Sequence, residues 1–149
     1  MTASCQIDFY VLSSSGLDAG HMACRLALMS WERGHRTTIV TETGESARQL
    51  DALMWESPAM RFLPHELATG SEPGAAPVVI ALMDGLPRNS VGECDVLINL
   101  SPQAVQEPER FKRLLEIVPQ EKEARAASRQ KYRFYQDMGI EPGAHEISK

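Results

Sequence analysis

The hydrophobic positions at the start of the chain change from a strand period to a helix period and back. Apolar residues alternate with polar ones over residues 7–12, which predicts a strand. Helical spacing follows after a serine-rich turn, with Asp18 as the expected cap and Gly34 as the expected end. A β-branched run over residues 36–41 then predicts a second strand.

The middle of the chain contains a second helical segment, an irregular stretch and two continuous apolar runs. Helical spacing over residues 44–55 predicts a helix with Thr43 as its cap. Four prolines fall in residues 56–77, which we expect to be mostly irregular. Residues 78–83 and 95–100 are typical of strands that are buried on both faces of a parallel sheet.

Two prolines mark expected helix starts in the last third of the chain. Pro108 would begin a helix through Leu115, and Pro119 would begin a final helix that Gly139 ends. This order of elements predicts an α/β fold, a three-layer Rossmann-like domain with a mostly parallel central sheet. We expect a single domain over residues 1–149.

Composition and charge narrow the classes of function. The chain is 43% hydrophobic and 23% charged, which is typical of a globular protein, and its formal net charge is −5. That acidic balance argues against a general nucleic-acid binder. Three cysteines without a CxxC pair indicate reduced thiols in a cytoplasmic protein and no metal site. We expect no signal peptide and no membrane span.

The loop after the first expected strand is the one candidate nucleotide site. Gly16 and Gly20 lie near a helix start, where a phosphate could bind. The loop contains no lysine, Asp18 would repel a phosphate, and neither glycine-rich nucleotide-binding motif occurs in the chain. The histidines lack metal-binding spacing and no G-x-S-x-G element occurs, so we assign no catalytic residue, metal or cofactor. A nucleotide-using Rossmann-like enzyme remains an alternative.

The last expected helix gathers positive charge on one face of an acidic protein. At about 100° per residue, one face holds three arginines and an aromatic ring: Arg125, Arg129, Tyr132 and Arg133. A solvated charged face is the ordinary explanation of such a run. However, acidic partners are scarce along this face, and arginine suits carboxylate and phosphate groups better than lysine does.

Two ligands remain open for this basic face, an acidic peptide or a phosphate backbone. The negative charge of the rest of the protein favours a short acidic peptide over a long nucleic acid. A direct single-strand binder, with Tyr132 stacking on a base, stays an alternative. On the opposite side of the helix we expect core residues that include Tyr135 and Met138, with Lys131 reaching outward from their edge.

Large apolar residues in the proline-marked segment form a second candidate surface. The stretch "LMWESPAMRFLPHEL" contains Trp55, Met60, Phe62 and Leu63. Such residues on a connection either fold back onto the core or form the centre of a protein interface. Both interpretations remain open on the pattern alone.

The two surfaces together resemble a known family. The elements "FYVL", "APVVIA" and "CDVLINL", the W-x6-F-x-P-H stretch from Trp55 to His65, and the R-x-x-Y-R-x-Y stretch from Arg129 to Tyr135 resemble the chi subunit of bacterial DNA polymerase III. The resemblance extends from Phe9 to Gly139. It implies a non-catalytic accessory protein with a Rossmann-like fold and no functional nucleotide site.

The resemblance also implies partners and binding residues. A chi-like protein would form a heterodimer with the psi subunit, which tethers it to the clamp loader, and would meet DNA only indirectly. The psi-binding residues would be Trp55, Phe62, Leu63, Pro64 and His65. A second surface would bind the acidic C-terminal tip of single-stranded DNA-binding protein through Val118, Arg125, Arg129, Tyr132 and Arg133.

Overall fold

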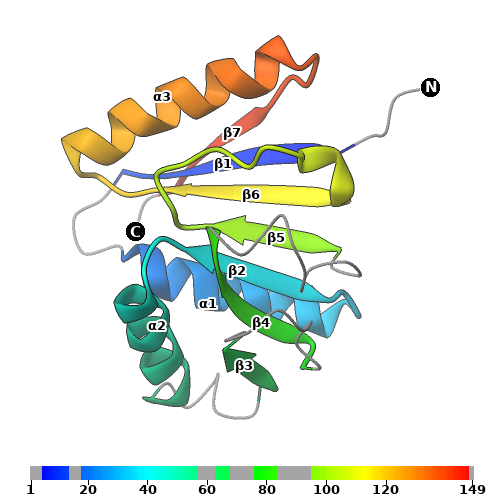
Figure 1. Ribbon diagram of the computed structural model, residues 1–149, viewed down its shortest axis with the longest axis vertical. Helices are drawn as coiled ribbons and strands as arrows, with labels where there is room; N and C mark the ends of the chain where they lie inside the picture. Colours follow the sequence, from blue (N-terminus) through cyan, green and yellow to red (C-terminus); the bar gives the residue numbers. More distant parts are fainter. Residues whose placement is uncertain (1–4, 14–17, 57–62, 68–75, 84–94, 148–149) are drawn as a thin grey trace.

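The computed structural model of the protein describes residues 5–13, 18–56, 63–67, 76–83 and 95–147. These residues form seven strands, three α-helices and one 3-10 helix (Figure 1). In chain order they are β1 (Gln6–Leu12), α1 (Ala19–Glu32), β2 (Thr37–Thr41), α2 (Gly44–Glu56), β3 (His65–Leu67), β4 (Val78–Leu82), β5 (Val96–Asn99), η2 (Pro108–Arg110), β6 (Arg113–Val118), α3 (Lys122–Asp137) and β7 (Gly143–Ile147).

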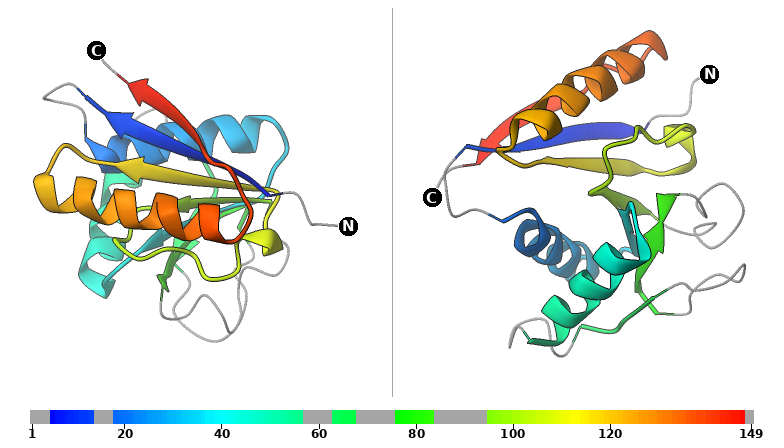
Figure 2. Two further views of the ribbon diagram at one scale, coloured as in Figure 1. Left: turned by 90° about the horizontal axis from the view of Figure 1, so that it is seen from above. Right: turned by 60° about the vertical axis from the view of Figure 1, so that its left-hand side comes forward.

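The strands form one sheet in the order β3-β4-β2-β5-β6-β1-β7, and every pair in it is parallel. One apolar cluster joins α1 and α2 to one face of the sheet, and a second joins α3 to the other face. Figure 2 shows α1 and α3 on opposite sides of the strands. The predicted three-layer Rossmann-like fold is therefore confirmed. No described helix has the length and apolar composition needed to cross a membrane.

The predicted helix caps and ends are confirmed. Asp18 Oδ2 accepts a hydrogen bond from the His21 amide at 3.0 Å at the start of α1. Thr43 Oγ1 accepts one from the Ser46 amide at 3.1 Å at the start of α2. Gly34 and Gly139 follow the ends of α1 and α3 with φ of 83° and 90°, a conformation that favours glycine.

The helix predicted from Pro108 through Leu115 is wrong. Only Pro108–Arg110 is helical, as the 3-10 turn η2, and Arg113–Val118 is strand β6. This strand lies between β5 and β1 and is buried on both faces, so its residues show no strand alternation. The buried Glu116 interrupts the apolar run and makes it resemble a helix period.

Three further boundaries differ from the sequence-based expectation. The segment expected to be mostly irregular contains the three-residue strand β3, and an additional strand, β7, follows α3. The last helix begins at Lys122 instead of Pro119, which follows directly on β6. On that helix Tyr135 is fully buried as expected, but Met138 is 41% exposed and is not part of the core.

A polar cluster attaches the edge strand β7 to β1. The carboxylate of Asp8, which is 4% exposed, accepts hydrogen bonds from Arg113 Nη2 and Gln6 Nε2, and His145 Nε2 of β7 lies 3.0 Å from Oδ1. A Cβ atom at Gly143 would lie 2.7 Å from the same oxygen, so β7 approaches Asp8 closely because that position is glycine. Burial opposes ionisation of Asp8, yet these hydrogen bonds outweigh it and lower its pKa.

We predict that Asp8→Asn destabilises the protein near pH 7 by about 1–3 kcal/mol, since charged hydrogen bonds to a buried group are lost. A lowered carboxyl pKa stabilises the folded state above the unfolded pKa of about 4, and that stability is lost as the pH falls through the folded value. The gap in melting temperature between wild type and Asp8→Asn should therefore shrink below about pH 4. The exposed Glu146→Gln on β7 is the control; a gap that stays constant with pH would contradict the assignment.

Candidate protein-binding site

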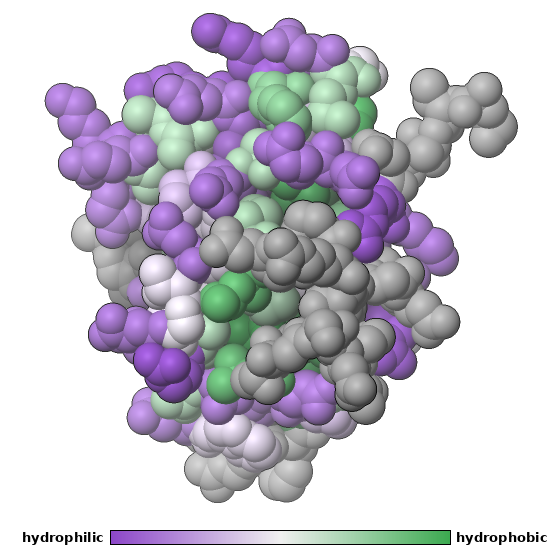
Figure 3. Space-filling model, viewed as in Figure 1, coloured by the Kyte–Doolittle hydropathy of each residue, from purple (hydrophilic) through white to green (hydrophobic). Residues whose placement is uncertain are grey.

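Helix α3 carries the predicted basic face above β1 and β6. The tyrosines of α3 pack on Phe9 of β1, with ring centroids 5.3 Å apart for Tyr132 and 6.1 Å for Tyr135. Figure 3 shows hydrophilic side chains interleaved with apolar ones over α3 at the top of the view. The inward face of the helix is thus fixed by Tyr135, and the arginine side faces outward.

The three arginines lie at successive helical turns, so they occupy one stripe along α3. Arg129 and Arg133 are exposed, and neither makes an ion pair or hydrogen bond with any residue that the structure describes. Arg125 is half-buried, and its Nη2 donates to the carbonyl oxygen of Leu12 at 3.2 Å. No described carboxylate neutralises the stripe, so its charge is available to a ligand.

Tyr132 lies beside this stripe and is held at both ends. Its ring packs on Phe9, and its hydroxyl donates to Pro142 O at 3.0 Å and to Glu141 Oε2 at 3.3 Å. Partial burial, and then the Glu141 carboxylate, raise the pKa of Tyr132. The half-buried ring offers an apolar surface of fixed orientation next to the guanidinium groups.

The fold places this region at a topological switch point. The chain leaves β1 toward α1 on one face and leaves the adjacent β6 toward α3 on the other. In parallel α/β sheets, ligands bind outside the carboxyl ends of strands where the winding reverses. Val118 ends β6 and Leu12 ends β1, and the hydrogen bond from Arg125 to Leu12 O joins α3 to the end of β1. Val118 itself is only 4% exposed and packs in the core.

The prediction that Lys131 reaches outward from the edge of the core is wrong. Lys131 is 6% exposed, and its Nζ lies 2.8 Å from Glu116 Oε1 and 2.6 Å from Ser101 O. The same carboxylate accepts from the Tyr135 hydroxyl at 2.6 Å and from Asn99 Nδ2 at 2.9 Å. Burial, and then the negative charge of Glu116, raise the pKa of Tyr135.

Sequence reasoning missed this buried network, although a signal existed. A glutamate inside an apolar run and a lysine in the apolar sector of a helix both need a partner once buried. Pairing Glu116 with Lys131 satisfies both, since each would otherwise be an isolated charge in the core.

The described members of the predicted psi-binding set lie at the opposite end of the sheet, around β3. Trp55, near the end of α2, is 53% exposed, and its ring lies 4.5 Å from that of His65. His65 is buried, with Nδ1 2.7 Å from Leu63 O and Nε2 3.5 Å from Asp51 Oδ1. The buried imidazole therefore supports an indole that remains exposed.

The other members of this predicted set divide between surface and core. Pro64 is exposed, whereas Leu63 is 1% exposed and belongs to the core under α2. Phe62 lies outside the described residues. Among the described members of the predicted psi-binding set, a partner could directly contact Trp55 and Pro64.

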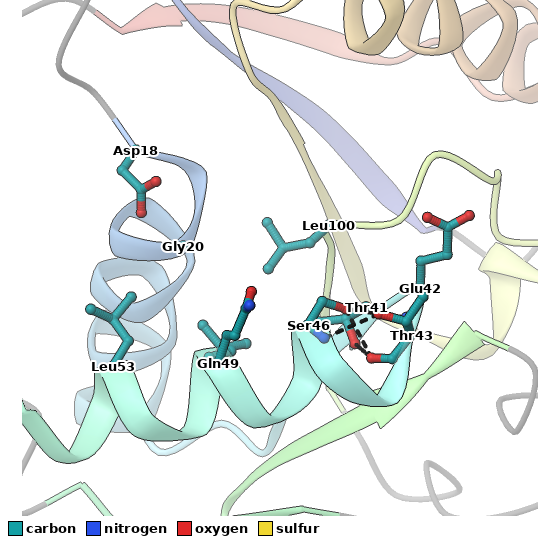
Figure 4. A pocket seen from close by; sticks show the side chains of 10 residues that line it. Asp18, Gly20, Thr41, Glu42, Thr43, Ser46, Gln49, Leu53 and Leu100 are labelled. Atoms are coloured by element: carbon teal, nitrogen blue, oxygen red, sulfur yellow. Dashed lines mark hydrogen bonds between the residues drawn. The ribbon is translucent and has the colours of Figure 1, made fainter.

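A pocket of ≈ 360 Å³ lies near the candidate nucleotide loop, between the starts of α1 and α2 (Figure 4). Asp18, Glu42 and Thr43 are among the residues that line it, and the described lining includes no basic side chain. Asp18 already occupies one of the first amide groups of α1, since it accepts from the His21 amide. Both features oppose the binding of a phosphate.

Comparison with known proteins shows similarity to one family over nearly the whole chain. The chain matches the family model described as DNA polymerase III chi subunit, HolC, over residues 5–143. It is 33% identical over 145 residues to DNA polymerase III subunit chi of Pseudomonas aeruginosa, covering 97% of this chain and 98% of the relative. It is 32% identical over 137 residues to the subunit of the same name in Escherichia coli K12, covering 89% and 91%.

These matches include both the strands of the sheet and the basic helix. The chain belongs to the DNA polymerase III chi subunit family, whose members are non-catalytic accessory subunits of the replicative polymerase.

Proposed function

We propose that this protein links two partners within the clamp-loader assembly. One partner is the psi subunit, bound through the surface around Trp55. The other is the acidic C-terminal tip of single-stranded DNA-binding protein, bound through the basic face of α3. The protein then works in DNA replication in the cytoplasm and meets DNA only through its partners.

The observation that carries the second contact is the stripe of arginines without described carboxylate partners. From Arg125 to Arg133 the helix rises about 12 Å at 1.5 Å per residue. An extended peptide covers about 3.3–3.6 Å per residue, so roughly four residues match the stripe. That length suits a short acidic tail, with guanidinium groups on its carboxylates and its apolar end against Tyr132.

The positions of the two surfaces support a bridging role. Trp55 and His65 lie by β3, at one edge of the sheet, whereas α3 lies over β1 and β6 near the other edge (Figure 1). With strands about 4.8 Å apart, the four to five steps from β3 to β6 and β1 span about 19–24 Å. The two surfaces are therefore separate, and one partner can bind at each.

We predict that Arg129→Ala weakens binding of an acidic peptide ending in phenylalanine by roughly 10- to 100-fold, since a charged hydrogen bond contributes about 1.5–3 kcal/mol. Titration by fluorescence anisotropy measures the effect, and affinity should fall as salt rises. Arg25→Ala, an exposed arginine of α1, is the control. Equal peptide binding by Arg129→Ala and wild type would refute the site, and tighter binding of a single-stranded oligonucleotide would favour the direct DNA-binding alternative.

We predict that Trp55→Ala weakens the psi complex about 30-fold or more, as loss of an interface tryptophan often costs 2 kcal/mol or more. The fold should persist because the indole is largely exposed. Trp31→Ala, which removes the 37% exposed tryptophan of α1, is the matched control. A pull-down of psi with each variant gives the comparison; equal recovery of psi would place its surface elsewhere.

We predict that millimolar ATP or NAD leaves the melting temperature unchanged, because Asp18 and Glu42 line the pocket between the helix starts. Differential scanning fluorimetry at neutral pH measures this. A rise in melting temperature that grows with nucleotide concentration would instead support the nucleotide-binding alternative.

A further inference from the structure

Helix α3 contacts the sheet through the packing of Tyr132 and Tyr135 on Phe9 and through a buried polar network. Only Lys131 and Tyr135 of its 16 residues are buried, whereas α1 buries six residues, five of them apolar. Both buried side chains of α3 end in polar atoms that bond to Glu116 of β6, at 2.8 Å and 2.6 Å. One carboxylate of β6 therefore bonds to both buried side chains of α3.

The same network fastens α3 to the segment that follows β5. Lys131 Nζ donates to Ser101 O at 2.6 Å, and the Tyr135 hydroxyl accepts from the Val105 amide at 2.9 Å. Asn99 Nδ2 donates to Glu116 at 2.9 Å. Within the described part of the chain, none of the buried side-chain atoms that lack a hydrogen-bond partner belongs to this network.

Stability alone does not account for such a network. Removing two charges from water is costly, and well-packed apolar side chains of similar volume often stabilise a fold as well or better. A fully hydrogen-bonded polar network favours a single orientation of α3 on the sheet. A rotated helix would leave both Lys131 and Glu116 buried without a partner. Tyr132 follows Lys131 directly, so fixing Lys131 inward also fixes where the ring of Tyr132 lies.

We propose that Glu116 is a positioning residue for the basic face: it locks the rotation of α3, and thereby aligns Tyr132 and the arginine stripe for an acidic peptide. The peptide part of this inference rests on the proposed function, whereas the locking of α3 does not. Glu116 touches no ligand and acts only through Lys131 and Tyr135.

The test replaces the charged pair by a neutral one in the double variant Glu116→Gln/Lys131→Met. Glutamine still accepts hydrogen bonds from Tyr135 and Asn99, so volume and most partners are kept. Two readouts are measured: the NMR shifts of the Tyr132 ring, which depend on its position over Phe9, and the affinity for the acidic peptide. Leu50→Ala, which loosens the core under α2 on the other face, controls for lost stability alone.

We expect the double variant to unfold cooperatively, to move the Tyr132 ring signals toward those of an exposed tyrosine, and to bind peptide about tenfold more weakly, which corresponds to about 1.4 kcal/mol. Leu50→Ala should change neither readout. Tyr132 signals that stay in place would overturn the inference, as would a Leu50→Ala variant that moves them equally. Moved signals together with no peptide binding by wild type would instead reject the proposed function and leave the locking of α3 standing.

A double variant that does not fold is replaced by Tyr135→Phe, which removes only the hydroxyl that bonds to Glu116 and Val105. The same two readouts then apply. We expect smaller changes of the same sign, and unchanged Tyr132 signals in this variant would also overturn the inference.

Discussion

The ion pair between Glu116 and Lys131 is the contact on which the outer face of this protein depends. It lies where an apolar contact would be expected, between a central parallel strand and α3, the one α-helix that the structure describes on that side of the sheet. The direction of the exposed side chains of α3 follows from this pair, from the Tyr135 hydroxyl bonded to the same carboxylate, and from the packing of the tyrosine rings on Phe9. A buried ion pair thus orients the exposed basic face of α3.

Much of the fold could be predicted from local signals. Asp18 and Thr43 cap helices, and Gly34 and Gly139 follow helix ends, because those roles depend on one side chain or one φ angle. Strand β6 could not be identified in the same way. Its neighbours β5 and β1 cover both sides of it, and only the pairing, which is a long-range property, distinguishes it from a helix.

In the candidate site, too, some features follow from local sequence and others depend on contacts between distant elements. The arginine stripe follows from helical spacing, so the sequence was sufficient to gather Arg125, Arg129 and Arg133 on one side. The place of Lys131 depends instead on Glu116 of strand β6, an element that the sequence pattern does not identify as a strand. Leu63 and His65 are likewise buried. The sequence could not predict this, because a strand as short as β3 contains too few residues to show an alternation of apolar and polar positions.

The position of β1 has a consequence for how this protein is made. The first strand of the chain pairs with β6 and β7, the last two, so Gln6 lies opposite Arg113. While the ribosome is producing β2 to β5, β1 has neither neighbour, and Phe9 and Ile7 lack the helix that later covers them. The sheet therefore cannot be completed until β6 and β7 have been synthesised, and closing so long a loop makes assembly slow. Until then β1 is an unpaired apolar segment of the newborn chain, the kind of segment that chaperones protect.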